Sequence, residues 1–364
     1  MRHPILAPLG VAFAAALSAT PIASPLNAIN PPHAAQAAAA HKVSLVAGEG
    51  LKEPFAIDFD ARGNLYVAEM GGQGVSIIDQ AGKVTKLAGT GVAGLSGDGG
   101  PAASAQLHDP HHLLMSPDGQ RLFVADTMNF SVRAIDLRTR VITRLAGTGQ
   151  KGFSGDGGPA VSAQFGGIFA LQLRGRLLYL CDLDNRRIRT INLDTGIVTT
   201  IAGNGEKGVP KDGEPAIAQP LVDPRAIAVD ARGAVYICER NGHALRVVDP
   251  DGRIRTIAGN GEAGYAGDDG PARDAKLNGP KSLSMDGEDV LITDTENHVI
   301  RRYSPKDGRI TRVAGTGVLG SDGVGGPATS CQLNRPHGAH RNAATGILYI
   351  ADSENHRVLS VDPK

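Results

Sequence analysis

The chain has 364 residues, of which 41% are hydrophobic, and it contains 48 glycines and 22 prolines. Lys plus Arg and Asp plus Glu each total 37, and aromatic residues make up only 4%, with no tryptophan. Balanced charge leaves no basic surface for nucleic acid, and there are few aromatic rings for bases to stack on. The composition therefore favours a turn-rich β protein and argues against nucleic-acid binding.

The N-terminal segment has the pattern of a secretory signal peptide. Arg2 and His3 precede the apolar run ILAPLGVAFAAALSA, and AQA (35–37) offers a cleavage site, with PIAS as an earlier candidate. The apolar run is shorter than the roughly 20 residues that a membrane span needs. We expect a signal peptide over 1–37, a short linker over 38–41, and export to the periplasm or the cell exterior without membrane insertion.

The rest of the chain is built from repeats. A strand-like run ending in an acid recurs six times, at Glu69, Asp126, Asp182, Glu239, Asp294 and Asp352. Each copy holds four strand-like runs separated by turn dipeptides such as Asp118-Gly119. Six copies of four strands predict an all-β fold over 42–364, a six-bladed β-propeller of four-stranded blades.

The two ends of the repeat region complement each other. The sixth copy stops one strand short, whereas KVSLVA (42–47) precedes the first copy and matches the fourth-strand run RITRVA (309–314). Pairing of the N-terminal strand with the last blade would close the ring and remove its exposed edges. We therefore expect removal of 42–47 to destabilise the whole ring.

Two copies carry a family resemblance. ILYIADSENHRVLSVD (347–362) and VLITDTENHVIRRYS (290–304) resemble NHL repeats, and the GDGGPA loops resemble the long-loop NHL subtype of secreted and cell-surface proteins. The resemblance implies a six-bladed, TolB-like β-propeller. Such propellers serve as protein-interaction modules, nucleic-acid binders, sensor domains and, in some relatives, lyases.

A glycine-rich loop with the pattern G-x-G-x-x-G begins at Gly89, Gly147, Gly203, Gly259 and Gly315. Five copies without a βαβ unit exclude a dinucleotide site and indicate a structural loop. Its Pro-Ala-x-x-Ala-x-Leu end predicts a helical turn, followed by residues that plug between blades: Leu107, Phe165, Leu277 and Leu333. Single loop aspartates lack the clustered carboxylates that calcium needs. The first copy lacks the loop, which predicts a gap in the rim of this face.

Residues that recur in every copy are interpreted as structural. The strand-ending acids and the nearby asparagines, which are Asn129, Asn185, Asn241, Asn297 and Asn355, are expected to form polar staples of the turns. A ring of catalytic acids is the alternative reading. Cys181 and Cys238 occupy the same repeat register, where a bridge is unfavourable, so these two and Cys331 are predicted to be free, mostly buried thiols.

Function is expected where the copies differ. The residue after the Pro that opens the innermost strand varies from copy to copy, Ile168 replacing that Pro in the third, and reads Phe55, His111, Phe169, Arg225, Lys281 and His337. With His112 beside it, this ring at the channel mouth would suit an anionic small ligand or a carboxylate of a protein partner. The alternative is six unrelated, solvated residues around a wet channel.

Two functions from different classes follow. The first is a monomeric binding or scaffold propeller without a cofactor, which engages a protein or small anion on its loop-bearing face. The second is a metal-assisted lyase or lactonase-like hydrolase. In it, His111 and His337 would hold zinc or another divalent metal, Glu69 or Asp126 would turn inward as a third ligand, and Arg225 or Lys281 would bind a substrate carboxylate.

Overall fold

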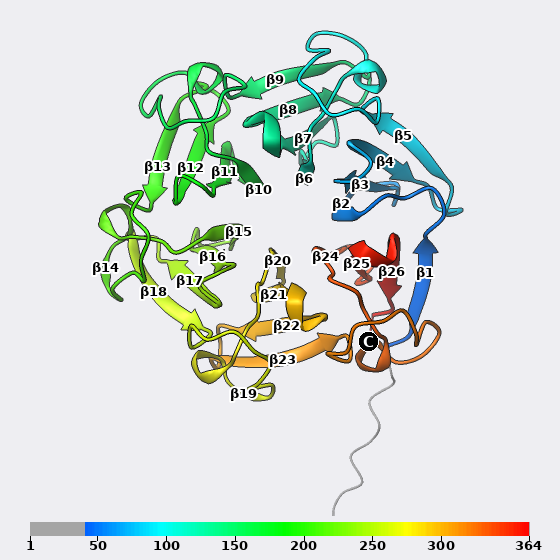
Figure 1. Cartoon of the computed structure of the whole chain (residues 1–364), viewed down its shortest axis with the longest axis vertical. Helices are drawn as coiled ribbons and strands as arrows, with labels where there is room; N and C mark the ends of the chain where they lie inside the picture. The colour runs from blue at the N-terminus through cyan, green and yellow to red at the C-terminus, as the bar shows by residue number, and fades with distance from the viewer. Residues whose placement is uncertain (1–40, 364) are drawn as a thin grey trace, which may run out of the picture. The chain divides into compact units, whose positions relative to one another are not determined.

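Six β-sheets lie side by side around a central axis in the computed structural model of the chain (Figure 1). The structure describes residues 41–363, so the expected signal peptide (1–37) lies outside the described residues. Within each sheet neighbouring strands are antiparallel, and most neighbours are consecutive in the sequence. The predicted six-bladed β-propeller is thereby confirmed.

Each blade runs from an innermost to an outermost strand. Blades 1 to 3 consist of β2 (Pro54–Phe59), β3 (Leu65–Glu69), β4 (Gly74–Ile78) and β5 (Val84–Ala88); β6 (Pro110–Met115), β7 (Arg121–Asp126), β8 (Ser131–Asp136) and β9 (Ile142–Ala146); and β10 (Ile168–Arg174), β11 (Leu177–Asp182), β12 (Arg187–Asn192) and β13 (Val198–Ala202). Blades 4 to 6 consist of β15 (Pro224–Val229), β16 (Val235–Glu239), β17 (Ala244–Val248) and β18 (Arg253–Ala258); β20 (Ser282–Asp286), β21 (Asp289–Asp294), β22 (Val299–Ser304) and β23 (Arg309–Ala314); and β24 (Gly338–Arg341), β25 (Leu348–Asp352), β26 (Arg357–Val361) and β1 (Val43–Ala47).

Closure of the ring follows the predicted pairing. β1 pairs antiparallel with β26, with Val43 opposite Val361 and Leu45 opposite Leu359. Val43 is 1% exposed and packs with residues of blades 5 and 6. The N-terminal strand thus supplies the fourth strand of blade 6, beside the C-terminal strand (Figure 1).

Two blades have a fifth strand that the sequence analysis did not predict. The short strands β14 (Glu214–Pro215) and β19 (Gly270–Pro271) pair with the outermost strands of blades 4 and 5. They belong to the glycine-rich loops, whose proline folds back onto the outer strand. Pro101, Pro159 and Pro327 make the same contact as isolated bridges, so the blades share one design.

Short 3-10 turns are the helical elements of the described residues. After the loop prolines they are η1 (Ala102–Ser104), η3 (Ala160–Ser162), η4 (Ala216–Ala218), η5 (Ala272–Asp274) and η7 (Ala328–Ser330); in the turns between second and third strands they are η2 (Thr127–Asn129), η6 (Thr295–Asn297) and η8 (Ser353–Asn355). The first group confirms the predicted helical turn. Between residues 41 and 363, none of these helices has the length and apolar character to cross a membrane.

The core lies between neighbouring blades. The four residues expected to plug the blades, Leu107, Phe165, Leu277 and Leu333, are at most 1% exposed. Phe165, for example, packs with Leu114 and Phe123 of blade 2 and with Leu180 of blade 3. All three cysteines are buried and unpaired, as predicted.

Glycine is needed where each loop leaves the outermost strand. Gly147 has φ +92°, and a Cβ atom there would lie 2.2 Å from the carbonyl oxygen of Phe130. Gly203 has φ +86°, and its Cβ would lie 2.0 Å from the carbonyl oxygen of Arg186. Only glycine combines this left-handed conformation with such close backbone approach. The loop motif is therefore structural, as the sequence analysis concluded.

Candidate functional site at the channel mouth

The six variable residues converge at one end of the central channel. Phe55, His111, Phe169 and Arg225 each occupy the second position of an innermost strand, and Lys281 and His337 directly precede theirs. At the first four, the register of pairing with the second strand of the blade shifts by one residue, so each of them lies in a β-bulge. A bulge re-aims its side chain, and this explains why these residues turn towards the channel.

The side chains of this channel ring touch one another. The ring of Phe55 stacks on His337 with centroids 3.9 Å apart and meets His111 edge-on at 4.9 Å. His111 in turn meets Phe169 edge-on at 4.7 Å, and the guanidinium of Arg225 lies 4.4 Å above Phe169. These are favourable geometries for aromatic pairs and for a cation over a π face.

The six residues of the ring differ in burial. Phe55, Arg225 and His337 are only 4 to 7% exposed. His111, Phe169 and Lys281 are half-buried. The six residues therefore form a cluster of contacting side chains, three of them shielded from solvent and three partly open to it.

The two cations of the ring have different surroundings. The ammonium of Lys281 lies 2.7 Å from the Glu296 carboxylate and 3.4 Å from Nε2 of His337. Arg225 donates only to the carbonyl oxygen of Phe169, at 3.4 Å, and its buried Nε has no partner. No acid of the described chain lies within ion-pair distance of Arg225. Burial, followed by the nearby charge of Arg240, lowers the pKa of Arg225 to about 10.

An acidic and basic network surrounds Lys281. Glu296 comes from η6 and also binds Arg335, whose Nη1 contacts Glu354 at 3.1 Å. Burial raises the pKa of Glu296, but hydrogen bonds from Arg335 and Lys281 outweigh this and bring it to about 2. These residues were not predicted from the sequence, because the turns between second and third strands recur in every copy and were interpreted as structural. The signal that could have identified them is a glutamate at the same turn position in blades 5 and 6, Glu296 and Glu354.

His112 does not join the channel ring. It lines a cavity of about 90 Å³ further along the channel, together with Asp58, His340, Gln172 and Ser284. Nδ1 of His112 is buried without a hydrogen-bond partner, and Nδ1 of His340 lies 3.7 Å from Asp58. Burial raises the pKa of Asp58. Side chains alternate along a strand, which places His112 away from the position of His111.

Burial also sets the charge of the two neighbouring histidines and gives a testable pH dependence. It lowers the pKa of both His111 and His112 from 6.5 to about 3. Between pH 6.5 and about pH 3, each histidine therefore binds more protons in the unfolded chain than in the folded one. The contribution of each histidine to the free energy of unfolding thus falls as the pH drops through this range. We expect His112→Gln to reduce this loss, by up to about 1.4 kcal/mol per pH unit.

The measurement is a urea titration of the original protein and of His112→Gln at several pH values. Buried carboxyl groups act in the opposite sense, because burial raises the pKa of Asp126, Asp182 and Asp294 to about 6. Only the difference between the two curves reports on His112. Parallel curves from pH 7 to pH 4 would contradict the assignment.

The candidate metal ligands His111 and His337 both contact the ring of Phe55. Glu69 and Asp126, the suggested third ligands, point into the turns, where they bind Ser76 and Arg133. Across residues 41–363, no group of three or more His, Cys, Asp or Glu side chains is placed to hold a metal ion. The inward turn of Glu69 or Asp126 is thus contradicted.

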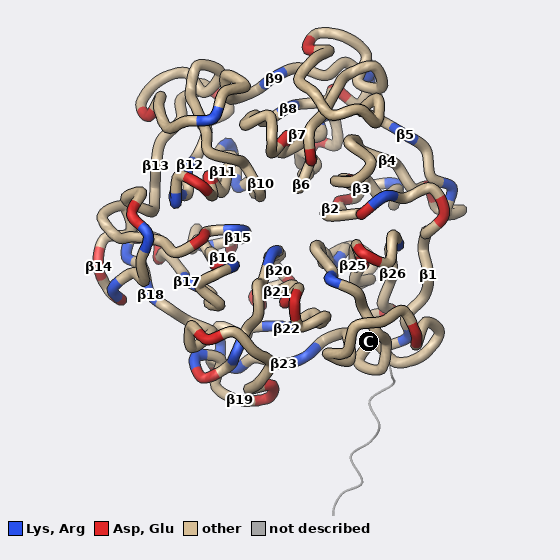
Figure 2. The backbone as a smooth tube through the Cα atoms, viewed as in Figure 1, with Lys and Arg blue, Asp and Glu red and all other residues tan. Residues whose placement is uncertain are grey.

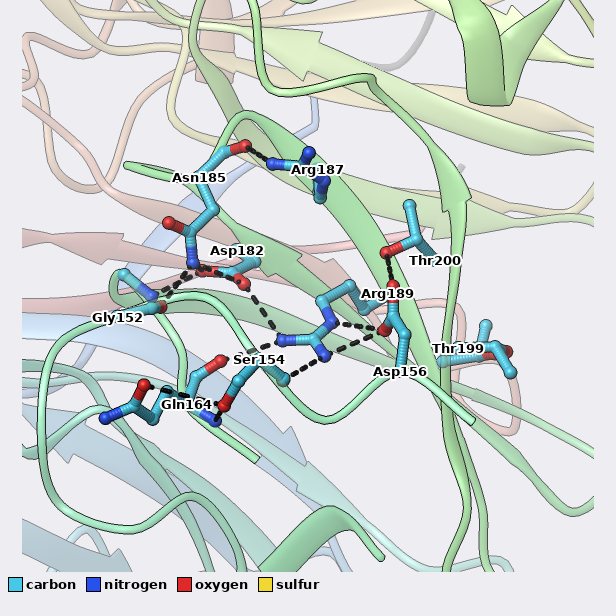
Figure 3. Close-up of polar contacts among 12 residues, drawn as sticks. Gly152, Ser154, Asp156, Gln164, Asp182, Asn185, Arg187, Arg189, Thr199 and Thr200 are labelled. Carbon is cyan, nitrogen blue, oxygen red and sulfur yellow. Dashed lines mark hydrogen bonds and ion pairs between the residues drawn. The ribbon is translucent and has the colours of Figure 1, made fainter. Parts of the chain in front are cut away.

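The strand-ending acids form polar staples with the predicted asparagine in four blades, but not with Asn241 in blade 4, and they also have an arginine partner that was not predicted. In blade 3, Asp182 accepts from Nδ2 of Asn185 and pairs with Arg189 of the third strand at 3.4 Å (Figure 3). Arg189 is fully buried and also donates to the carbonyl oxygens of Gln164 and Ser154 at 2.9 and 2.8 Å. The five arginines of this kind are Arg133, Arg189, Arg246, Arg301 and Arg357.

Comparison with known proteins agrees with this architecture. The NHL repeat model matches residues 333–359. NHL repeat-containing protein 2 of Gallus gallus is 25% identical over 286 residues, which are 70% of this chain and 38% of that protein. Protein SUPPRESSOR OF QUENCHING 1, chloroplastic, of Arabidopsis thaliana is 26% identical over 278 residues, 72% of this chain and 26% of that protein. The chain thus spans well under half of these relatives.

A solved structure shows the same fold at low sequence identity. An auxiliary nutrient binding protein from Bacteroides thetaiotaomicron aligns with TM-score 0.62 at 16% identity, over 88% of this chain and 75% of that one. The fold and the ring together define a six-bladed β-propeller with a cluster of contacting side chains at its channel mouth. The chain carries an NHL repeat at 333–359 and is similar to NHL repeat-containing proteins.

Proposed function

We propose that this propeller is an exported binding module that receives a carboxylate, from a small ligand or a protein partner, at the channel ring. The observation that carries the proposal is Arg225, a buried cation without an acidic partner among the described residues. A buried charge is costly unless it is paired, and an arriving carboxylate would supply the pair.

The arrangement around Arg225 supports an anion rather than a cation. Lys281 is the neighbouring ring position, and Figure 2 shows basic residues at β15 and at β20 on the inner side of their blades. Five of the six neighbouring pairs of the ring are in contact, and the sixth pair is the two cations Arg225 and Lys281. A guanidinium presents a planar fork that matches a carboxylate, which suits recognition of this group.

Further support comes from the shared fold. A propeller of this shape occurs in a protein named for nutrient binding, and a binding role needs no catalytic group. The signal-peptide pattern of residues 1–37 supports export, and we propose that the binding module works outside the cytoplasm.

The test uses thermal unfolding in the presence of small carboxylates and their uncharged amides, for example succinate against succinamide. We expect carboxylates to raise the unfolding temperature of the original protein and Arg225→Met to abolish this shift. Arg174→Met is the matched control, because Arg174 is exposed and donates only to the carbonyl oxygen of Ala231.

Stability without ligand gives the second readout. Methionine keeps most of the apolar volume and removes the unpaired charge, so Arg225→Met should unfold with an equal free energy or one about 1 kcal/mol higher. A shift that survives in Arg225→Met, or no shift with any carboxylate of the panel, would contradict the proposal.

A further inference from the structure

Blade 1 lacks the arginine that its five counterparts carry. Ser76 occupies the third-strand position, opposite Lys86, that Arg246 occupies in blade 4 opposite Thr256. Glu69, the strand-ending acid, is only 3% exposed and accepts hydrogen bonds from the Ser76 hydroxyl and from the backbone N–H of Lys52. No cationic side chain of the described chain forms an ion pair with it. Glu69 is thus a buried carboxylate with hydrogen bonds but no counter-charge.

The loop that covers this position in other blades is also missing. Blades 2 to 6 carry a glycine-rich loop over the staple, whereas only 48–53 connect β1 to β2. In its place lies a cavity of about 580 Å³, lined by Glu49, Lys52, Glu69, Ser76, Lys86 and Thr90 among others. The predicted gap in the rim is therefore a pocket with Glu69 in its wall.

Blade 4 shows what would fill such a pocket. Its acid is also a glutamate, Glu239, followed three residues later by Gly242, as Glu69 is followed by Gly72. A Cβ atom at either glycine would lie within 3 Å of the glutamate Cβ, so the two turns are equivalent. In blade 4, both Nε and Nη2 of Arg246 lie 2.7 Å from Oε2 of Glu239.

The lysines of the pocket do not take the place of this arginine. Lys86 donates to the carbonyl oxygen of Gly72 at 3.1 Å, and Lys52 is exposed. Each carboxylate oxygen of Glu69 holds one hydrogen bond, and a carboxylate offers about four acceptor sites. Room for further donors therefore remains on Glu69.

We propose that the blade 1 pocket binds the guanidinium of a ligand, which takes the place of the missing arginine and pairs with Glu69. The planar fork of a guanidinium forms two parallel hydrogen bonds to a carboxylate, whereas an ammonium acts as a point charge. The guanidinium belongs either to a free small molecule or to an arginine side chain of a partner, whose backbone would then lie where the loop is absent.

Isothermal titration calorimetry with four probes tests the proposal. The probes are acetyl-arginine amide and a blocked Gly-Arg-Gly peptide, with the corresponding lysine compounds as controls. We expect saturable 1:1 binding of the arginine probes, with the lysine probes roughly tenfold weaker, the effect of one charge-assisted hydrogen bond. Tighter binding of the peptide than of the single residue would identify a polypeptide segment as the ligand, and equal binding a small molecule.

Two variants locate the binding site. Ser76→Arg installs the side chain of the other blades, so it should raise the denaturation midpoint and abolish binding of both arginine probes. Glu69→Gln keeps an acceptor for the Lys52 N–H and removes the charge, so it should also abolish binding. Ser104→Arg, an exposed position on the blade 2 loop, adds the same charge elsewhere and should leave binding unchanged.

Two results would overturn the proposal. One is the absence of saturable binding of either arginine probe to the original protein. The other is binding that persists in both Ser76→Arg and Glu69→Gln. Because the pocket and the channel ring take ligands of opposite charge, the carboxylate and guanidinium assays fail or succeed independently.

Discussion

Arg301→Met is expected to lower the free energy of unfolding by about 3–5 kcal/mol, the loss typical of a broken buried ion pair. Arg301 is fully buried, and its guanidinium pairs with Asp294 at 3.3 Å and Asp268 at 2.8 Å. It also donates to two carbonyl oxygens, those of Lys276 and Ala266. Methionine would leave Asp294, itself fully buried, without a counter-charge.

Urea denaturation monitored by circular dichroism measures this loss. Arg253→Met is the matched control, because Arg253 is exposed and lies 3.7 Å from an equally exposed Asp251. Such surface pairs contribute at most about 1 kcal/mol. The double variant Arg301→Met with Asp294→Asn should recover part of the loss, since it removes the orphaned charge. If Arg301→Met lowered the free energy of unfolding by less than Arg253→Met does, the ion pairs of Arg301 would not stabilise the loop.

Buried arginines therefore have two roles in this molecule. Arg301 has acidic partners and is expected to stabilise the fold, whereas Arg225 has none and is expected to contribute little or nothing to stability. The contrast separates a structural cation from one available to a ligand. Comparison of Arg301→Met with Arg225→Met tests this distinction directly, because both remove a buried guanidinium and differ in what surrounds it.

The repeat made the fold predictable from the sequence. Strand-ending acids at a regular spacing, turn dipeptides and a spare strand at the N-terminus specify blade number and closure without knowledge of any contact. The short strands β14 and β19 were not predictable, because two loop residues carry no periodic signal. The ion pair between Asp182 and Arg189 was not predicted, because an arginine in a sequence is expected to be solvent-exposed unless an acidic partner is known to lie beside it.

The channel ring was only partly predictable. Alignment on the strand-opening proline found all six positions, since repeats place equivalent residues at equivalent points. Phe55 and Arg225 turn inward because they lie in β-bulges, and no pattern in the sequence predicted these bulges. Contact of Phe55 with the imidazoles of both His111 and His337 depends on side chains from blades far apart in sequence. The sequence repeat identifies the six equivalent positions of the ring. The chemistry available at each position depends on contacts between blades, which the repeat does not predict.

Deletion of residues 42–47, which contain β1, is expected to abolish cooperative folding of the ring. Val43 would leave the core, and Val358, Leu359 and Val361 of β26, all at most 2% exposed, would lose the strand that covers them. Burial of one such side chain contributes about 1.5–3 kcal/mol, so the loss is comparable with the whole stability of a typical domain, about 5–15 kcal/mol. Soluble yield and the urea unfolding curve measure the effect.

A circular permutant distinguishes loss of the strand from loss of the chain end. Joining Lys364 to His41 and opening the chain before the exposed Glu49 keeps β1 but makes it follow β26. The paired register, Val43 opposite Val361, then requires only a short hairpin loop of the kind that connects outer strands in the other blades. This permutant should fold with near-original stability, whereas the deletion variant should not. If both fold equally well, closure by β1 does not stabilise the ring, and hydrophobic contacts between blades suffice to hold it.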